Sequence, residues 1–261
     1  MSEEQLWDQV KQQLKYIQNQ RQQLQDLRER VGRLESMIEL YVADPQIKWL
    51  LENRSERMDA TLPFFDSGRA AFHLDRYEFA SRYVAGKQVA DIACGTGYGS
   101  RTLKEQGQAA TVQGIDIDQE AVDYATARHG VDGVSFLCRS GDETGLPAES
   151  YEVIASFETI EHVPDDGKLV TEFARLLKPN GLLICSTPNL WPLAIAPHHV
   201  REYDRTQFEE VLNTHFEILE MHNQNSGTSF EFNREQPRGI VATTEENESL
   251  AECFLAVCRK R

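Results

Sequence analysis

Two glutamates and a histidine fall within five residues of the segment 156–163, which reads SFETIEHV. Glu158, Glu161 and His162 stand at positions i, i+3 and i+4, a spacing that places side chains on one face of a helical turn. Two carboxylates that converge on one space repel each other unless a proton, a cation or water separates them. The spacing therefore predicts either a solvated first turn or a binding site.

The composition limits the partners of this chain. It has 261 residues, a formal net charge of −15 and a pI near 4.9. Nucleic acid and anionic membranes would repel most of such a surface, so neither is expected as a partner. No stretch approaches the roughly 20 apolar residues of a membrane span, and the first residues are too polar for a signal peptide. We expect a cytoplasmic protein whose five cysteines, none in a CxxC pair, are reduced and mostly buried.

The N-terminal segment from Leu6 to Tyr41 carries a heptad repeat. Its a positions are Val10, Ile17, Leu24, Val31 and Ile38, and its d positions include Leu6, Leu27, Leu34 and Tyr41, with Gln13 and Gln20 interrupting the d column. Mostly β-branched residues at a with Leu at d favour a two-stranded parallel coiled coil. We therefore predict an oligomerisation helix over residues 1–43, forming a homodimer or higher oligomer. A helix folded back on its own domain also fits the pattern.

Beyond Asp44-Pro45 and a short helical stretch (Gln46 to Met58), residues 44–261 alternate between strand-like and helical segments. Seven segments read as strands: QVADIA, TVQGIDI, VSFLCRS, YEVIASF, GLLICST, FEILEMH and AECFLAVC. Helical segments such as Ser100–Gln106, Gln119–His129 and Asp166–Leu177 separate the first five. This order predicts an α/β domain with a doubly wound, seven-stranded, Rossmann-like sheet, its last two strands antiparallel at one edge. In such sheets ligands bind beyond the carboxyl ends of the strands.

The first strand leads into a glycine-rich loop, and the second strand ends in an acid. The loop reads D-I-A-C-G-T-G-Y-G from Asp91 to Gly99, and glycines there let a ligand lie against backbone N–H groups at a helix N-terminus. Asp116 follows about 20 residues later, where an acid accepts both hydroxyls of a ribose. An ordinary tight turn or a dinucleotide site also uses glycines, but Asp91 at the entry of the loop would repel a pyrophosphate.

This combination resembles the class I S-adenosylmethionine-dependent methyltransferases over residues 70 to 261. The preceding H-x-x-R-Y segment, His73 to Tyr77, is similar to segments of many such enzymes. The resemblance implies S-adenosylmethionine as cofactor and assigns its contacts as follows: Asp91, Gly95, Thr96 and Gly97 beside the methionine part, Asp116 on the ribose, Ile117 on the adenine, Asp142 on its exocyclic amine, and Tyr77 as a cover. For Tyr77, packing of a helix onto the sheet is an equal alternative, and His73 also fits a surface position.

The E-x-x-E-H arrangement resembles that of metal-dependent O-methyltransferases acting on ubiquinone precursors or on the 2′-hydroxyl of small RNAs. It implies Mg²⁺ or Mn²⁺ held by Glu158, Glu161 and His162, with His199 of the segment H-V-R-E-Y as a further ligand. The interval from His162 to His199 is shorter than in the RNA enzymes, and His198 is the neighbouring alternative. Metal-independent relatives also carry E-H-V, where the glutamate caps a helix and the histidine packs or acts as a base.

The acceptor is predicted only as a class. A metal-assisted O-methyltransferase acting on a sugar or polysaccharide hydroxyl is favoured, because the acidic body disfavours RNA and vicinal hydroxyls chelate cations. Trp191 and Tyr203 are candidates for stacking on a sugar ring. The motifs together resemble those of methyltransferases of glycan biosynthesis. A small aromatic or quinone-like acceptor is an alternative, and so is a non-catalytic assembly module in which the coiled coil does the work.

Overall fold

The structure is a computed structural model that describes residues 3–53, 57–63, 65, 67–191, 193, 196, 198–227 and 236–261. Contacts within the chain divide it into two compact units, residues 1–54 and 55–261. The sequence placed this boundary after residue 43. The structure assigns the next short helix to the N-terminal unit.

The described residues of the N-terminal unit, 3–53, form two helices. Helix α1 runs without interruption over Glu3–Ala43, which confirms the helix predicted for Leu6 to Tyr41. Asp44 then ends α1 and caps helix α2, Pro45–Glu52, by accepting a hydrogen bond from the Gln46 N–H at 2.9 Å. Helix α2 is shorter than the predicted stretch to Met58 and ends at the C-cap Asn53. Within the described residues, every helix is either too short or too polar to cross a lipid bilayer.

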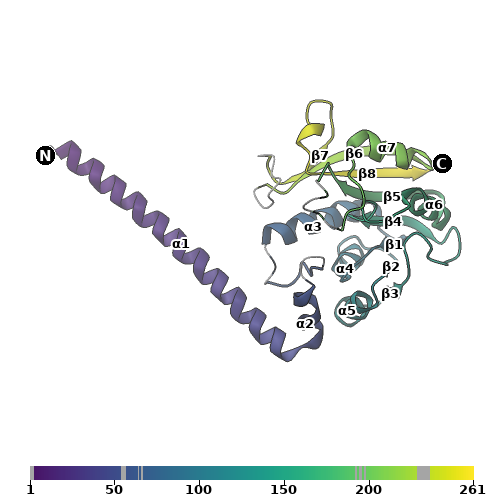
Figure 1. Cartoon of the computed structure of the whole chain (residues 1–261), viewed down its shortest axis with the longest axis horizontal. Coiled ribbons are helices and arrows are strands. Elements are labelled where there is room, and N and C mark those ends of the chain that lie inside the picture. The colour runs from purple at the N-terminus through teal and green to yellow at the C-terminus, as the bar shows by residue number, and fades with distance from the viewer. Residues whose placement is uncertain are drawn as a thin grey trace. The chain divides into compact units, whose positions relative to one another are not determined.

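In the part of the chain that the structure describes, the second unit is built on a sheet of eight strands in the order β3-β2-β1-β4-β5-β8-β6-β7 (Figure 1). The strands are β1 Gln88–Ile92, β2 Thr111–Asp116, β3 Val134–Cys138, β4 Tyr151–Phe157, β5 Leu177–Pro188, β6 Phe216–Asn225, β7 Gly239–Ala242 and β8 Cys253–Lys260. Strands β1 to β5 are parallel, and β8 is antiparallel to both β5 and β6. All seven predicted strands are present, but the predicted number is wrong. The missed strand β7 has only four residues, and it forms the edge beyond the predicted antiparallel pair.

Five α-helices of the described residues surround this sheet. They are α3 Ser67–Ala80, α4 Tyr98–Glu105, α5 Gln119–His129, α6 Asp166–Leu176 and α7 Arg205–Asn213, with short 3₁₀ helices at Ser81–Tyr83 and Glu248–Leu250. Helices α6 and α7 pack against each other beside β5 and β6, whereas α4 contacts α3 and α5 and lies beside β2 (Figure 1). The sheet is therefore covered on both faces, as a doubly wound fold requires.

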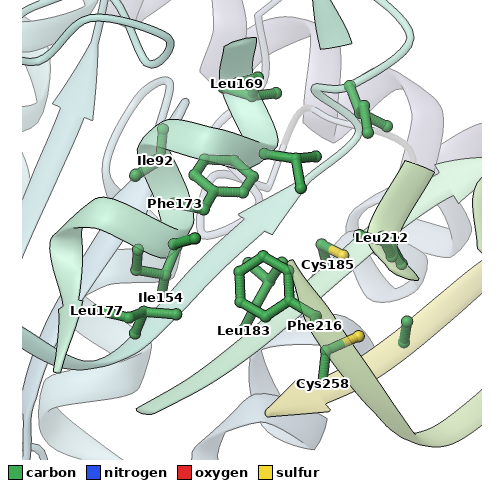
Figure 2. Close-up of a cluster of buried hydrophobic side chains, with 14 of the residues drawn as sticks. Ile92, Ile154, Leu169, Phe173, Leu177, Leu183, Cys185, Leu212, Phe216 and Cys258 are labelled. Atoms are coloured by element: carbon green, nitrogen blue, oxygen red, sulfur yellow. The ribbon is translucent and has the colours of Figure 1, made fainter. Parts of the chain in front are cut away.

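Apolar side chains fill the space between the sheet and helices α6 and α7. Ile154 and Leu183 of the central strands meet Phe173 of α6 and Phe216 of β6 in this cluster (Figure 2). Each fully buried side chain of this size contributes about 1.5–3 kcal/mol. The five cysteines are free thiols, four of them buried and Cys138 half-buried, as predicted. This rigid core fixes the carboxyl ends of β1, β2 and β4, where the candidate site lies.

Candidate active site

A cavity of about 510 Å³ opens at the carboxyl ends of β1, β2 and β4. It is lined by Arg57, Ala93, Ile115, Asp116, Ile117, Ser140, Gly141, Asp142, Glu158, Thr159, His162, Val163, Pro164 and His198. This size suits a nucleoside-like ligand. Of the predicted cofactor residues, Asp116, Ile117 and Asp142 belong to this lining.

The glycine loop turns sharply between β1 and α4. Its backbone reverses at Gly95 and Gly97, whose φ angles are +54° and +86°, and the Ala93 and Cys94 N–H groups donate to the Ile115 carbonyl of β2. A Cβ atom at Gly97 would lie 2.6 Å from that of Ala125, so only glycine fits there. The loop therefore brings backbone, rather than side chains, toward the helix N-terminus.

Asp91 and Tyr77 lie behind this loop and outside the lining of the cavity. The Asp91 carboxylate is fully buried and accepts hydrogen bonds from the Ser100 hydroxyl at 2.6 Å and the Tyr77 hydroxyl at 3.3 Å. Burial raises the pKa of Asp91 to about 7, although the two hydrogen bonds oppose the shift. Tyr77 is buried against Tyr98 and Phe157. Packing of a helix onto the sheet, the alternative stated for Tyr77, describes its contacts with Asp91 of β1 and Phe157 of β4 better than a cover over the cofactor.

Asp116 is oriented by the backbone on both of its carboxylate oxygens. One oxygen accepts from the Gly95 N–H at 2.8 Å and the other from the Asp118 N–H at 3.0 Å. A carboxylate oxygen accepts more than one hydrogen bond, so each retains capacity for a ligand hydroxyl. The side chain is buried yet lines the cavity. This geometry suits a pair of vicinal ribose hydroxyls.

Ile117 and Asp142 complete one end of the cavity. Ile117 is 72% exposed and lines the cavity, so its apolar side chain is open to contact with a ligand ring. Asp142 accepts from the Ser140 hydroxyl at 2.5 Å and lies 3.4 Å from the Lys168 ammonium. These contacts lower the pKa of Asp142, the hydroxyl contributing most, and keep it ionised as an acceptor.

Arg57 is a cavity residue that the sequence did not reveal. Its guanidinium lies 3.2 Å from Asp118 and 3.6 Å from Asp116. The segment that carries it is anchored by Asp59, whose carboxylate contacts the Tyr124 hydroxyl at 2.9 Å and the His129 imidazole at 2.7 Å. Arg57 therefore offsets the negative charge of Asp116 and Asp118. No pattern in the sequence connects it to Asp116, since 59 residues separate them.

Glu161, His162 and His199 form a group that could hold a metal ion, and His162 also lines the cavity. One potential ligand atom of each lies within 4.8 Å of the others. His162 Nδ1 donates to the His198 carbonyl at 3.0 Å, so in the neutral ring Nε2 keeps its lone pair, 3.9 Å from Glu161 Oε1. Among the described residues, Glu161 Oε1 is a buried oxygen without a hydrogen-bond partner. Burial, and next the nearby Glu158, raises the pKa of Glu161 well above its usual range.

The segment H-V-R-E-Y holds this group together. The Val200 N–H donates to the Glu161 carbonyl at 2.9 Å. The Arg201 guanidinium donates to the carbonyls of Ile160, Val163 and Pro164 at 2.6 to 3.1 Å, so it clamps the loop that bears His162. These bonds bring the His199 ring to 4.7 Å from that of His162, centroid to centroid. Arg201 is therefore the residue of this motif that holds the loop bearing His162 in place, a role that the sequence did not reveal.

Glu158 lies outside the group, contrary to the prediction. The segment after β4 is a turn and not a helix, and Glu158 has a left-handed φ of +50°. Its carboxylate instead accepts from the Ser186 hydroxyl at 3.0 Å and lies 3.5 Å from the Arg76 guanidinium. Arg76 is 1% exposed and also donates to the Gln224 side chain at 2.6 Å. The second carboxylate is therefore neutralised by an arginine of the H-x-x-R-Y segment.

The two aromatic residues proposed for stacking on a sugar have other contacts. Tyr203 is buried and donates to Asp166 at 2.6 Å, so it offers no open ring face. Trp191 stacks on His199 with centroids 6.5 Å apart and donates to the Glu252 carbonyl. Both side chains support the loop of His199.

Comparison with known proteins agrees with this geometry. Residues 90–185 match the family model described as a methyltransferase domain. This part of the chain is therefore similar to methyltransferase domains. A probable S-adenosylmethionine-dependent methyltransferase of Mycolicibacterium smegmatis is 32% identical over 146 residues, covering 53% of this chain and 54% of that protein. A ubiquinone biosynthesis O-methyltransferase of Actinobacillus pleuropneumoniae is 34% identical over 123 residues, covering 44% of this chain and 52% of that protein. The chain spans about half the length of these relatives.

Solved structures support the fold. A Haloferax volcanii complex of the Trm112 methyltransferase activator and a putative methyltransferase contains a chain with a TM-score of 0.59 and 20% identity, covering 74% of this chain and 92% of that one. The [4+2]-cyclase SpnF has a TM-score of 0.56 and 18% identity, covering 74% and 82%. Because a cyclase shares the fold, the reaction has to be argued from the site.

Proposed function

We propose that this chain is an S-adenosylmethionine-dependent O-methyltransferase in which Glu161, His162 and His199 hold a divalent cation beside the acceptor hydroxyl. The observation that carries the proposal is the buried, unpartnered Glu161 Oε1, which shares a space with ring nitrogens of two histidines. A carboxylate oxygen in this position is costly unless a proton or a cation accompanies it. His162 belongs both to this group and to the lining of the cavity, so the group borders the space for substrate.

The residues at the far end of the cavity fit the cofactor. Asp116 is preoriented for two ribose hydroxyls, Ile117 offers an apolar surface for adenine, and Asp142 is an ionised acceptor for its amine. When bound, S-adenosylmethionine supplies an activated methyl group. The task left to the protein is to align the acceptor oxygen with that group and to help it lose its proton.

The residues at the near end would orient the acceptor. A bound divalent cation would lower the pKa of a coordinated hydroxyl. Thr187 donates to Glu161 Oε2 at 3.2 Å, and the His198 carbonyl fixes the ring of His162, so both ligands are held before any substrate enters. With Glu158 paired to Arg76, the set has one carboxylate and two imidazoles, which suits Mn²⁺ or another transition metal better than Mg²⁺.

We propose a vicinal diol as the acceptor, because two neighbouring hydroxyls chelate one cation. A sugar at the end of a glycan is the first candidate, in keeping with the acidic chain, whose net charge of −15 disfavours RNA. A catechol-like quinone precursor is the second candidate, and the ubiquinone O-methyltransferases among the relatives favour it. Methyl transfer to matched sugar diols and catechols, each compared with its monohydroxy analogue, would separate the two classes.

The metal is tested by binding as well as activity. We expect Mn²⁺ to bind with a stoichiometry of one per chain, measured by calorimetry on the chelator-treated protein. His162→Ala and His199→Ala should abolish this binding while leaving affinity for S-adenosylhomocysteine intact. His215→Ala is the matched control, since His215 contacts Thr171, which lies outside the cavity lining. Full methyl transfer by a metal-free preparation would refute the proposed cation site. His162 would then be assigned as a general base. Failure to bind S-adenosylhomocysteine would instead favour a non-catalytic assembly module.

A further inference from the structure

Helix α1 presents a row of exposed apolar side chains that Gln13 and Gln20 interrupt at two d positions. The a-position residues Val10, Ile17, Leu24, Val31 and Ile38 are 40–59% exposed, and the d-position residues Leu6, Leu27, Leu34 and Tyr41 are 39–53% exposed. Side chains at a and d lie along one seam of a helix. The seam extends over five heptads, more than the three or four that mark a coiled coil.

We propose that a second copy of this chain covers this seam, forming a parallel, in-register, two-stranded coiled coil. The residues of the seam indicate that its partner is a second α1 helix. Four of the five a positions are β-branched, and Leu6, Leu27 and Leu34 occupy d positions, the combination that favours two strands. The inference concerns α1 alone and does not depend on the proposed chemistry.

The two glutamines of the seam indicate whether the two α1 helices run parallel or antiparallel. In a parallel, in-register pair, Gln13 faces Gln13 of the second copy and Gln20 faces Gln20, so their amides can hydrogen-bond across the interface. In an antiparallel pair, each a residue faces a d residue. The arrangement that matches the apolar ends, Val10 with Leu34, then places Gln13 against Val31 and Gln20 against Leu24. Two polar side chains per helix would be buried against apolar partners, which is costly.

A charge pair at the edge of the seam favours the same arrangement. In a parallel coil, a residue at g faces the e residue five positions later on the partner helix. Arg30 at g would then face Glu35 at e of the second copy, an attractive pair repeated twice by symmetry. Such an exposed pair adds little energy, but it selects this register.

The direction is tested by cysteine cross-linking of the full-length protein. Gln13→Cys places one thiol in the core of the seam, where a parallel, in-register pair brings the two copies within disulfide distance. Gln12→Cys is the matched control, because the neighbouring residue at position c points away from the partner. We expect mild oxidation to give a covalent dimer with Gln13→Cys and at least tenfold less with Gln12→Cys. Four of the five native cysteines are buried and the fifth is half-buried.

Whether a second copy of the chain covers the seam is tested by measuring the molar mass of the protein in solution. Ile17→Lys combined with Val31→Lys puts charges at two a positions and should halve the subunit number seen by light scattering. Gln18→Lys combined with Gln25→Lys, both at outward b positions, should leave it unchanged. A monomeric native protein would overturn the proposal in favour of a helix that folds back on its own chain. A dimer that Gln13→Cys does not cross-link would overturn the parallel register, and a trimer would overturn the two-stranded form.

Discussion

If Asp116 binds the ribose, then substituting Asp116 and removing the ribose hydroxyls should weaken ligand binding through the same lost hydrogen bonds. Measuring both changes separates the loss of this contact from a distortion of the glycine loop. Asp116→Ala removes a charged acceptor, and each hydrogen bond to such a group contributes about 1.5–3 kcal/mol. The same change frees the Gly95 and Asp118 N–H groups that Asp116 holds. Weaker binding alone would therefore not show that the carboxylate contacts the ribose. One such bond lost already corresponds to at least a tenfold change in affinity.

A cycle of two proteins and two ligands isolates the contact. Wild type and Asp116→Ala are each titrated calorimetrically with S-adenosylhomocysteine and with its 2′,3′-dideoxy analogue. We expect removal of the two hydroxyls to cost the wild type at least tenfold in affinity and to cost the variant less than about threefold. Asp123→Ala, exposed on α5, should behave as the wild type. If both proteins lose the same factor on removal of the hydroxyls, the ribose lies elsewhere.

Two further substitutions test the buried charges. Arg76→Met should lower the free energy of unfolding in urea by about 3 kcal/mol, because it leaves Glu158 without its cation. Adding Glu158→Gln should restore part of this free energy. If the double variant shows no recovery, the pairing of Arg76 with Glu158 is refuted. Asp59→Asn should destabilise the protein at pH 7 by about 1–3 kcal/mol. Burial opposes ionisation of Asp59, but hydrogen bonds, chiefly with His129, outweigh it and lower its pKa. The stabilisation by ionised Asp59 is present above the pKa that this residue has in the unfolded protein, and it is lost as the pH falls through its pKa in the folded protein. The difference in Tm between Asp59→Asn and the wild type should therefore shrink below about pH 4. A difference that stays constant with pH would contradict the lowered pKa of Asp59.

The fold was predictable wherever an apolar run was long enough to specify one element. The helix Gln119–His129 was predicted with the bounds that it has, because Asp118 caps it and a glycine follows His129. Strand β7 was missed because four residues, GIVA, carry too little pattern. Its position at the sheet edge depends on pairing with β6, which is a tertiary contact that no local sequence expresses. The coiled coil stays a prediction, since one chain shows the helix and not its partner.

The candidate site was predictable in its location but not in the direction of each side chain. Loops at the carboxyl ends of β1, β2 and β4 had to meet, and the structure brings Asp116, Ile117, Asp142, Glu158 and His162 to one cavity. The i, i+3, i+4 argument for Glu158 assumed a helical turn. The left-handed backbone at this residue turns its carboxylate toward Arg76 instead. That arginine lies 82 residues earlier in the chain, so the spacing could not reveal it. The same pairing explains why two carboxylates tolerate each other near the cavity. Glu158 is neutralised by Arg76, and Glu161 has one buried oxygen that lacks a hydrogen-bond partner among the described residues, where we propose the cation.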